Sequence, residues 1–246
     1  MSNESIFKII DAAFSLPGVK IDRKAFLEEC FKDNTIEMRN KIVNTSPIQA
    51  GISQATLDAI AKKQISEELI RVSGMSALTG GVNIGGWTTA AGMALADLTQ
   101  YFAHCCRLCQ KLAYIYGWPD LNQASDLIFK IDNHDVRAAE VILFGCMFSV
   151  NKANEIVVEL STKCIAKHTG IRGFWTMIRP PVWLKVANQV GKVIGINISR
   201  DLAKRSVVKF VPFVGAATSG ALTYCVFNKA ADNLYKTLSQ HPIRNY

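Results

Sequence analysis

Residues 72–96 read VSGMSALTGGVNIGGWTTAAGMALA, a stretch of 25 residues without a charged side chain. Thirteen of these residues are apolar and six are glycine. A single helix of this length would reach about 37 Å, more than the roughly 30 Å of a bilayer's hydrocarbon core. Each glycine destabilises a helix by about 1 kcal/mol relative to alanine, which argues against a simple span. The stretch therefore predicts helical structure packed closely against a second helix.

A second uncharged run covers residues 210–228 and reads FVPFVGAATSGALTYCVFN. Small residues spaced four apart lie on one helix face and allow two backbones to approach closely. Gly81 precedes Gly85 by four positions in the first run, and Ala216 precedes Gly220 by four in the second. We expect the two runs to pack together through Gly81, Gly85, Gly215 and Gly220. Such packing suits a buried helix pair in a soluble domain, a membrane-inserted hairpin, or a protein that changes between the two.

The rest of the chain shows helical periodicity and no sustained alternation of period two. We predict an all-α protein, a single compact multi-helix bundle with two central glycine-rich apolar helices. Residues 1–50 are predicted to form an N-terminal helical extension, and residues 51–240 the main helical domain. The predicted helices cover residues 4–16, 21–31, 53–72, 88–116, 122–131, 134–149, 151–168, 183–209 and 212–239.

Several residues mark the ends and faces of these helices. Asp22 and Ser53 have side chains suited to capping a helix N-terminus. Gly117, followed by Pro119, is typical of a helix C-terminus. Within 53–72 the helical spacing predicts that the inward-facing side chains are Ala55, Ile60, Ile65 and Leu69.

The cysteines indicate a reducing environment. Seven cysteines form no regular framework, and the first ten residues lack the apolar core of a secretory signal. We therefore expect reduced thiols in a cytoplasmic protein.

Residues 104–109, HCCRLC, contain one C-x-x-C pair and no second pair, so no metal site is predicted. The glycine-rich residues 79–86 lack the lysine of a phosphate-binding loop, so no cofactor is predicted either.

Positive charge is concentrated in one band of the chain, residues 163–209. This basic band holds ten lysines and arginines and one acid, whereas the whole chain carries a net charge of +8. Within it, the helix predicted from Trp183 separates an apolar stripe from a face with Lys185 and Lys192, as in helices that lie in a headgroup layer. The alternative is an ordinary solvated helix face. The side chains expected to bind anionic lipid are Lys185, Lys192, Arg200, Lys204 and Arg205.

Nucleic acid would be another partner for a basic band. Phe174 and Trp175 lie between arginines and have rings that bases stack on. However, the chain shows no zinc-finger or helix-turn-helix signature, and residues 1–162 are slightly acidic. We therefore predict no nucleic-acid partner.

The polar residues that border the first uncharged run are candidates for buried polar groups: Asp97, His104 and Arg107. A buried acid must be paired with a cation or have a raised pKa. We expect Asp97 to form a salt bridge with Arg107 or with a lysine of the basic band. The less favoured alternative is an enzyme that uses Asp97 and His104.

Residues 77–121 and 190–235 resemble the EcsC family. The features are the glycine-rich run LTGG (78–81) through Gly86, then ADL (96–98), then a helix ending in AYIYG (113–117). The segment VPFVGA (211–216) is similar to a second signature of that family. The resemblance implies a bacterial helical protein with a membrane connection, because the family's name comes from a gene that accompanies an ABC transporter. It implies no activity, and the cysteines of HCCRLC depart from the family pattern.

Together these features predict a non-enzymatic, cytoplasmic protein that binds the inner face of a membrane, with partial insertion as an option. Anionic lipid is the expected partner, and the resemblance adds a membrane transporter. The alternative is a soluble helical protein that binds a lipid-like apolar ligand between the two uncharged runs.

Overall fold

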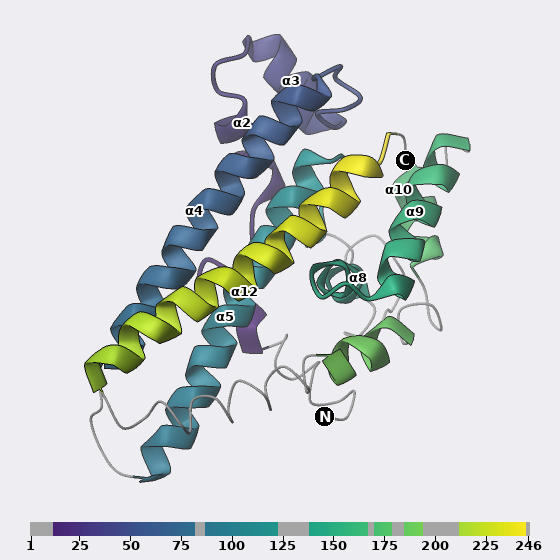
Figure 1. Ribbon diagram of the computed structural model, residues 1–246. Helices are drawn as coiled ribbons and strands as arrows, with labels where there is room; N and C mark the ends of the chain where they lie inside the picture. Colours follow the sequence, from purple (N-terminus) through teal and green to yellow (C-terminus); the bar gives the residue numbers. More distant parts are fainter. Residues whose placement is uncertain are drawn as a thin grey trace.

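The computed structural model describes residues 12–81, 87–122, 138–166, 170–178, 185–193 and 212–244. Over these ranges the chain is helical and contains no strand, which confirms the predicted all-α class (Figure 1). Residues 185–193 are also helical. The other helices are α2 (Arg23–Cys30), α3 (Ile36–Asn44), α4 (Gln54–Gly81), α5 (Trp87–Ile115), α8 (Ala138–Met147), α9 (Asn151–Ala166), α10 (Gly170–Met177) and α12 (Pro212–Gln240).

Three long helices, α4, α5 and α12, form one group, in which α4 and α12 pack along each other in opposite directions (Figure 1). At one end Gln54 Nε2 lies 3.3 Å from the carbonyl oxygen of Ser239. Two turns further along α4, Lys62 Nζ lies 5.7 Å from the ring centroid of Tyr235. Both contacts fix the register of α4 against α12. The N-terminal end of α12 therefore lies beside the C-terminal end of α4.

Helix α8 is the centre of the fold: every one of its residues is buried. It packs against α5, α9 and α12, and Figure 1 shows it end-on among them. Its sequence, AAEVILFGCM, is apolar on all sides apart from Glu140, as expected for a helix covered on every face. Gly145 permits the close approach of α9, because a Cβ there would lie 2.4 Å from Ala153 Cβ.

The predicted caps are confirmed at three helix ends. Asp22 accepts a hydrogen bond from Ala25 N–H, and Ser53 Oγ accepts one from Thr56 N–H. At the end of α5, Trp118 N–H donates to Ala113 O and Gly117 N–H to Tyr114 O, the two bonds of a Schellman motif. The left-handed residue of this motif is Gly117, with φ +89°.

The chain's C-terminal residues return to this turn. Ile243 N–H donates to Tyr116 O at 2.9 Å, and the Ile243 side chain is fully buried. The turn at the end of α5 therefore anchors the segment that follows α12.

Residues 12–50 contribute to the same continuous core as the rest of the chain, with Phe14, Leu27 and Ile42 among its buried members. Arg23 is buried and donates to the carbonyl oxygens of Trp118, Val43 and Thr45. Its guanidinium thus bridges the C-terminal carbonyls of α3 and the turn after α5. The division of the chain at residue 50 remains a prediction.

The structure differs from the prediction in several elements. The run 72–96 is not one helix: it comprises the end of α4 and the start of α5, with residues 82–86 outside the described ranges. Helix α4 continues nine residues past the predicted end at 72, through Gly74, Gly80 and Gly81, although each glycine costs about 1 kcal/mol in a helix relative to alanine. Helices α3 and α10 were not predicted, and the predicted helix 122–131 lies almost wholly outside the described residues.

Candidate functional site

A buried carboxylate on α4, that of Glu68, is the centre of a charged cluster between α4 and α5. Its side chain is fully buried, and Arg107 Nε donates to Glu68 Oε1 at 2.7 Å. The same guanidinium donates through its NH1 group to the carbonyl oxygen of Gly18. Arg107 therefore ties α5 both to α4 and to the segment before α2.

Three more basic side chains surround this carboxylate. Arg71 NH1 lies 3.6 Å from Glu68 Oε2, and Lys111 Nζ lies 4.0 Å from the same oxygen. His104 Nδ1 lies 3.7 Å from Oε1. One carboxylate is thus shared by two arginines, a lysine and a histidine, which we call the Glu68 cluster.

The electrostatics of the Glu68 cluster favour the charged carboxylate. Burial alone would raise the pKa of Glu68, but the nearby His104, the charge of Lys111, and the hydrogen bond and charge of Arg107 outweigh it and lower the pKa to about 2. Burial lowers the pKa of Lys111, and the charge of Glu68 partly offsets this. Glu68 therefore stays ionised, as a buried ion surrounded by cations must.

Sequence reasoning missed Glu68 because it placed the buried face of α4 incorrectly. The buried residues of α4 are Leu57, Ala61, Gln64, Glu68, Leu69 and Val72. Of the four residues predicted to face inward, Leu69 is buried as expected, whereas Ala55 is exposed and Ile60 and Ile65 are only half-buried. The spacing 57-61-64-68-72 is helical, so a polar residue at 68 on an otherwise mostly apolar stripe was the available signal.

The predicted polar residues have different surroundings from those expected. His104 is buried and Arg107 is about one-fifth exposed, and both contact Glu68. Asp97 lies on α5 ten residues before Arg107, about 15 Å along the axis, and its side chain is outside the described part of the structure. The partner of Arg107 is therefore Glu68 and not Asp97. Asp97 and His104 are about 10 Å apart along the helix, too far to bond directly.

The uncharged segments gather at one end of the α4–α5–α12 group, which we call the uncharged end (Figure 1). It comprises residues 72–81 of α4, 87–96 of α5 and 212–228 of α12, none of which carries a charge. Gly81 closes α4, and Gly215 and Gly220 lie in the first turns of α12. Gly85 lies outside the described residues.

The described part of the basic band includes the helical residues 185–193. Lys185 and Lys192 are exposed, while Val186 and Val190 are buried, so the helix has the two faces that its sequence indicates. This segment packs on α8, because a Cβ at Gly145 would lie 2.8 Å from Val186 Cγ1. Arg200, Lys204 and Arg205 lie outside the described residues.

Five cysteines form part of the core, the fifth being Cys164 on α9. Cys105, Cys106, Cys109 and Cys146 are fully buried, and burial raises the pKa of Cys105, Cys109 and Cys146. Cys109 Sγ lies 3.3 Å from Met147 Sδ, so this thiol packs like an apolar group. Within the described ranges, His, Cys, Asp and Glu side chains form no group of three able to hold a metal ion.

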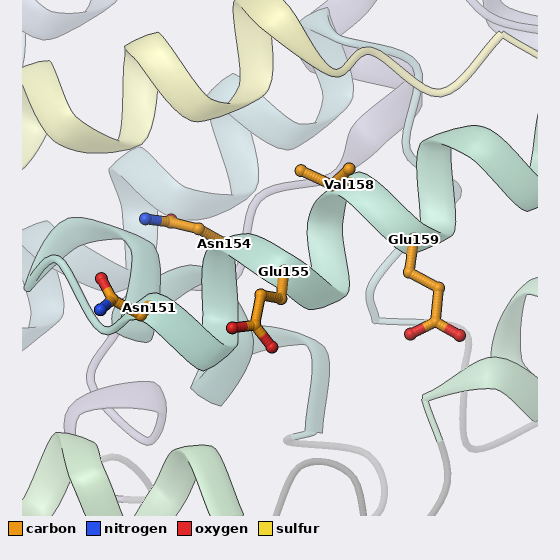
Figure 2. Close-up of a pocket in the computed structure, with 5 residues that line it drawn as sticks. All are labelled: Asn151, Asn154, Glu155, Val158 and Glu159. Carbon is orange, nitrogen blue, oxygen red and sulfur yellow. The ribbon is translucent and has the colours of Figure 1, made fainter.

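A shallow hollow on α9 has a volume of about 490 Å³ and is open to solvent. Figure 2 shows that its side chains point in different directions rather than toward one point. Lys152 pairs with Glu155 and Lys163 with Glu159, so both of its acids have cationic partners. The hollow has no converging polar groups and does not form a site. Its lining residues are Asn151, Asn154, Glu155, Val158 and Glu159.

None of the described helices is by itself both long enough and apolar enough to cross a bilayer. One pair, Ala138–Met147 with Asn151–Cys164, passes that test of length and composition together, with a bend of 119° between its halves. The first of these halves is the fully buried α8.

Comparison of the chain with models of known protein families, with curated proteins and with solved structures gives no match.

Proposed function

We propose that this chain is a non-enzymatic helical protein that associates with a membrane and contacts anionic lipid through its basic band. The observation that supports the proposal is the gathering of three uncharged helix segments at one end of the molecule (Figure 1). The cytoplasmic face of a bacterial inner membrane, the resemblance to the EcsC family and a transporter partner belong to the same proposal.

The length of the uncharged end suits shallow insertion. Residues 72–81 of α4 and 87–96 of α5 each extend about 15 Å along a helix, close to half of a hydrocarbon core of about 30 Å. Charged side chains cost several kcal/mol at the centre of a bilayer, so a segment that enters it must leave them out. A segment that enters lipid must also have all its backbone polar groups hydrogen-bonded. The three segments are helical, so their backbones meet this requirement.

The basic band supplies the electrostatic part of the proposal. Each lysine or arginine close to an anionic surface contributes about 1 kcal/mol at physiological salt. Lys185 and Lys192 are exposed on one face of the helical segment 185–193, and the opposite face of that segment packs on the core. We assign the same headgroup role to Arg200, Lys204 and Arg205.

Vesicle flotation tests this function. The protein is mixed with vesicles of phosphatidylcholine alone or of phosphatidylcholine with phosphatidylglycerol, and the fraction that floats is measured. We expect flotation with the anionic vesicles, and a loss of flotation in the double variant Lys185→Ala, Lys192→Ala. The matched control is Lys20→Ala, Lys24→Ala, which removes two exposed lysines from the other end of the chain and should float like the wild type.

Two results would contradict the proposal. Failure to float with either vesicle excludes membrane association of this chain. Equal flotation with neutral and anionic vesicles excludes the headgroup role of the basic band while leaving apolar insertion in place.

A further inference from the structure

Exposed apolar side chains gather where the uncharged end meets the charged part of the molecule. Ile70 on α4 is 71% exposed, and Tyr224 and Val226 on α12 are 46% and 43% exposed. They are three of the five large hydrophobic side chains that are exposed among the described residues. We call Ile70, Tyr224 and Val226 the α4–α12 belt.

The register of the two helices places these residues at one level. Because the helices are antiparallel, each step forward along α4 corresponds to a step back along α12. Position 70 of α4 therefore lies level with position 223 of α12 when counted from the Gln54–Ser239 contact, and with position 227 when counted from the Lys62–Tyr235 contact. Helix α5 gives an independent check. Glu68 of α4 contacts His104 of α5, and Phe227 of α12 packs on Tyr101, less than one turn away on the same helix. The belt therefore crosses two packed helices at one height.

Charge ends within two turns of this height on both helices, since by the same register Lys229 is level with positions 64–68 of α4. Arg71 is the last charged residue of α4, and its side chain is 49% exposed. Lys229 is the first charged residue of α12 after its uncharged segment, and it is exposed. These two border residues, on α4 and α12, are cations, whereas on α5 the uncharged segment is followed by an acid, Asp97. A tyrosine beside apolar side chains, flanked by arginine and lysine, is the composition of protein surfaces at the boundary between lipid and water.

We propose that the α4–α12 belt is the surface that sits at the headgroup level of an anionic bilayer, with the uncharged end below it in one leaflet. This inference rests on the proposed membrane association and adds the inserted element and its depth. Arg71 binds lipid phosphate in addition to Glu68, because the single carboxylate of Glu68 is shared with Arg107 and Lys111 and cannot neutralise all three cations. Lys229 supplies the matching cation on α12.

A native cysteine makes the inference directly testable. Cys225 lies between Tyr224 and Val226 and is exposed, whereas the other cysteines are buried or half-buried. In a Cys30→Ser variant, a polarity-sensitive fluorophore such as NBD can be attached to Cys225. We expect a blue shift and a gain in emission when vesicles of phosphatidylcholine with phosphatidylglycerol are added. The control carries the label at Val158→Cys on α9 in a Cys30→Ser, Cys225→Ser background, and its emission should not change.

A matched pair of exposed isoleucines gives a second measurement. Ile70→Ser removes a belt side chain, and Ile36→Ser removes one from α3, where Ile36 is 68% exposed. Because both side chains are in solvent, neither change should unfold the protein. We expect Ile70→Ser to weaken binding to anionic vesicles about tenfold and Ile36→Ser to leave it unchanged.

The outcomes separate this inference from the proposed function. Absence of flotation overturns both. Flotation without a change in the Cys225 label, or with equal effects of the two isoleucine variants, overturns the belt and leaves the basic band as the lipid contact. A blue shift that grows with protein concentration in the absence of vesicles shows that a second copy of the chain covers the belt, which also overturns the inference.

Discussion

Arg107 Nε donates to Glu68 Oε1 at 2.7 Å, and this bond joins two helices through a side chain that is fully buried on α4. The same arginine donates to the carbonyl oxygen of Gly18. Removal of the carboxylate would therefore leave buried cations without their shared partner, at the place where α4, α5 and the segment before α2 meet.

Glu68→Gln should lower the free energy of unfolding by about 3–5 kcal/mol, because loss of one partner leaves uncompensated buried charge. Urea denaturation at neutral pH measures this change. The control is Glu29→Gln, which breaks a solvent-exposed pair with Lys32 and should produce no measurable change. Equal effects of the two variants would show that the Glu68 cluster contributes nothing beyond a surface pair.

The free energy of unfolding should decrease at low pH, because the carboxylate of Glu68 becomes protonated. The pKa of Glu68 is about 2 in the folded protein, against 4.5 as its ordinary value. A carboxyl with a depressed folded pKa contributes stability above its unfolded pKa and loses it as the pH falls through the folded pKa. The wild type should therefore lose about 3 kcal/mol more than Glu68→Gln between pH 5 and pH 2. Urea titrations at intervals across that range measure the difference, and parallel curves for the two proteins would contradict the assignment.

Gly117→Ala should destabilise the protein by at least about 2 kcal/mol, since it adds strain at φ +89° and a Cβ only 2.3 Å from Ile243 O. Gly51→Ala is the matched control: φ there is +93°, but no atom lies within 4 Å of the added Cβ. It should cost about 1 kcal/mol, the backbone strain alone. Thermal unfolding measures both variants, and the difference in their stability is the cost of the contact between the added Cβ and Ile243. Equal stability of the two variants would show that this contact does not exist.

Two helical glycines should respond to alanine with opposite signs. Gly145→Ala places a Cβ 2.4 Å from Ala153 Cβ and 2.8 Å from Val186 Cγ1, so it should destabilise by about 1–3 kcal/mol. Gly74→Ala meets nothing within 4 Å in the middle of α4 and should stabilise by about 0.5–1 kcal/mol. Chemical denaturation gives both values. A stabilising Gly145→Ala would mean that α8 and α9 are further apart than the structure places them.

The sequence predicted those parts of the fold that depend on local chemistry. The caps at Asp22 and Ser53 and the helix end at Gly117 follow from backbone preferences of single residues, and all three are confirmed. Helix α3 was missed because only Ile42 on it is buried, so it shows no apolar stripe. Its start depends on one side chain, that of Thr35, which accepts from Met38 N–H.

The candidate site was less accessible to prediction, because its groups meet through tertiary contacts. His104 and Arg107 were recognised by their position beside an uncharged run, but their common partner lies 36 and 39 positions away on another helix. The uncharged run was recognised as well, yet its composition could not show that it is divided between two helices, α4 and α5. Pairing between helices is set by the whole surface of contact, which a local pattern does not contain.

The complete burial of α8 has a consequence for synthesis of the chain. Sixty-five positions separate Met147, the last residue of α8, from Pro212, the first residue of the α12 helix that helps to cover it. Apart from Glu140, α8 is apolar on all sides, and it is translated well before α12. Until α12 has been translated, α5 and α9 are available to cover α8, and the face that α12 covers stays exposed.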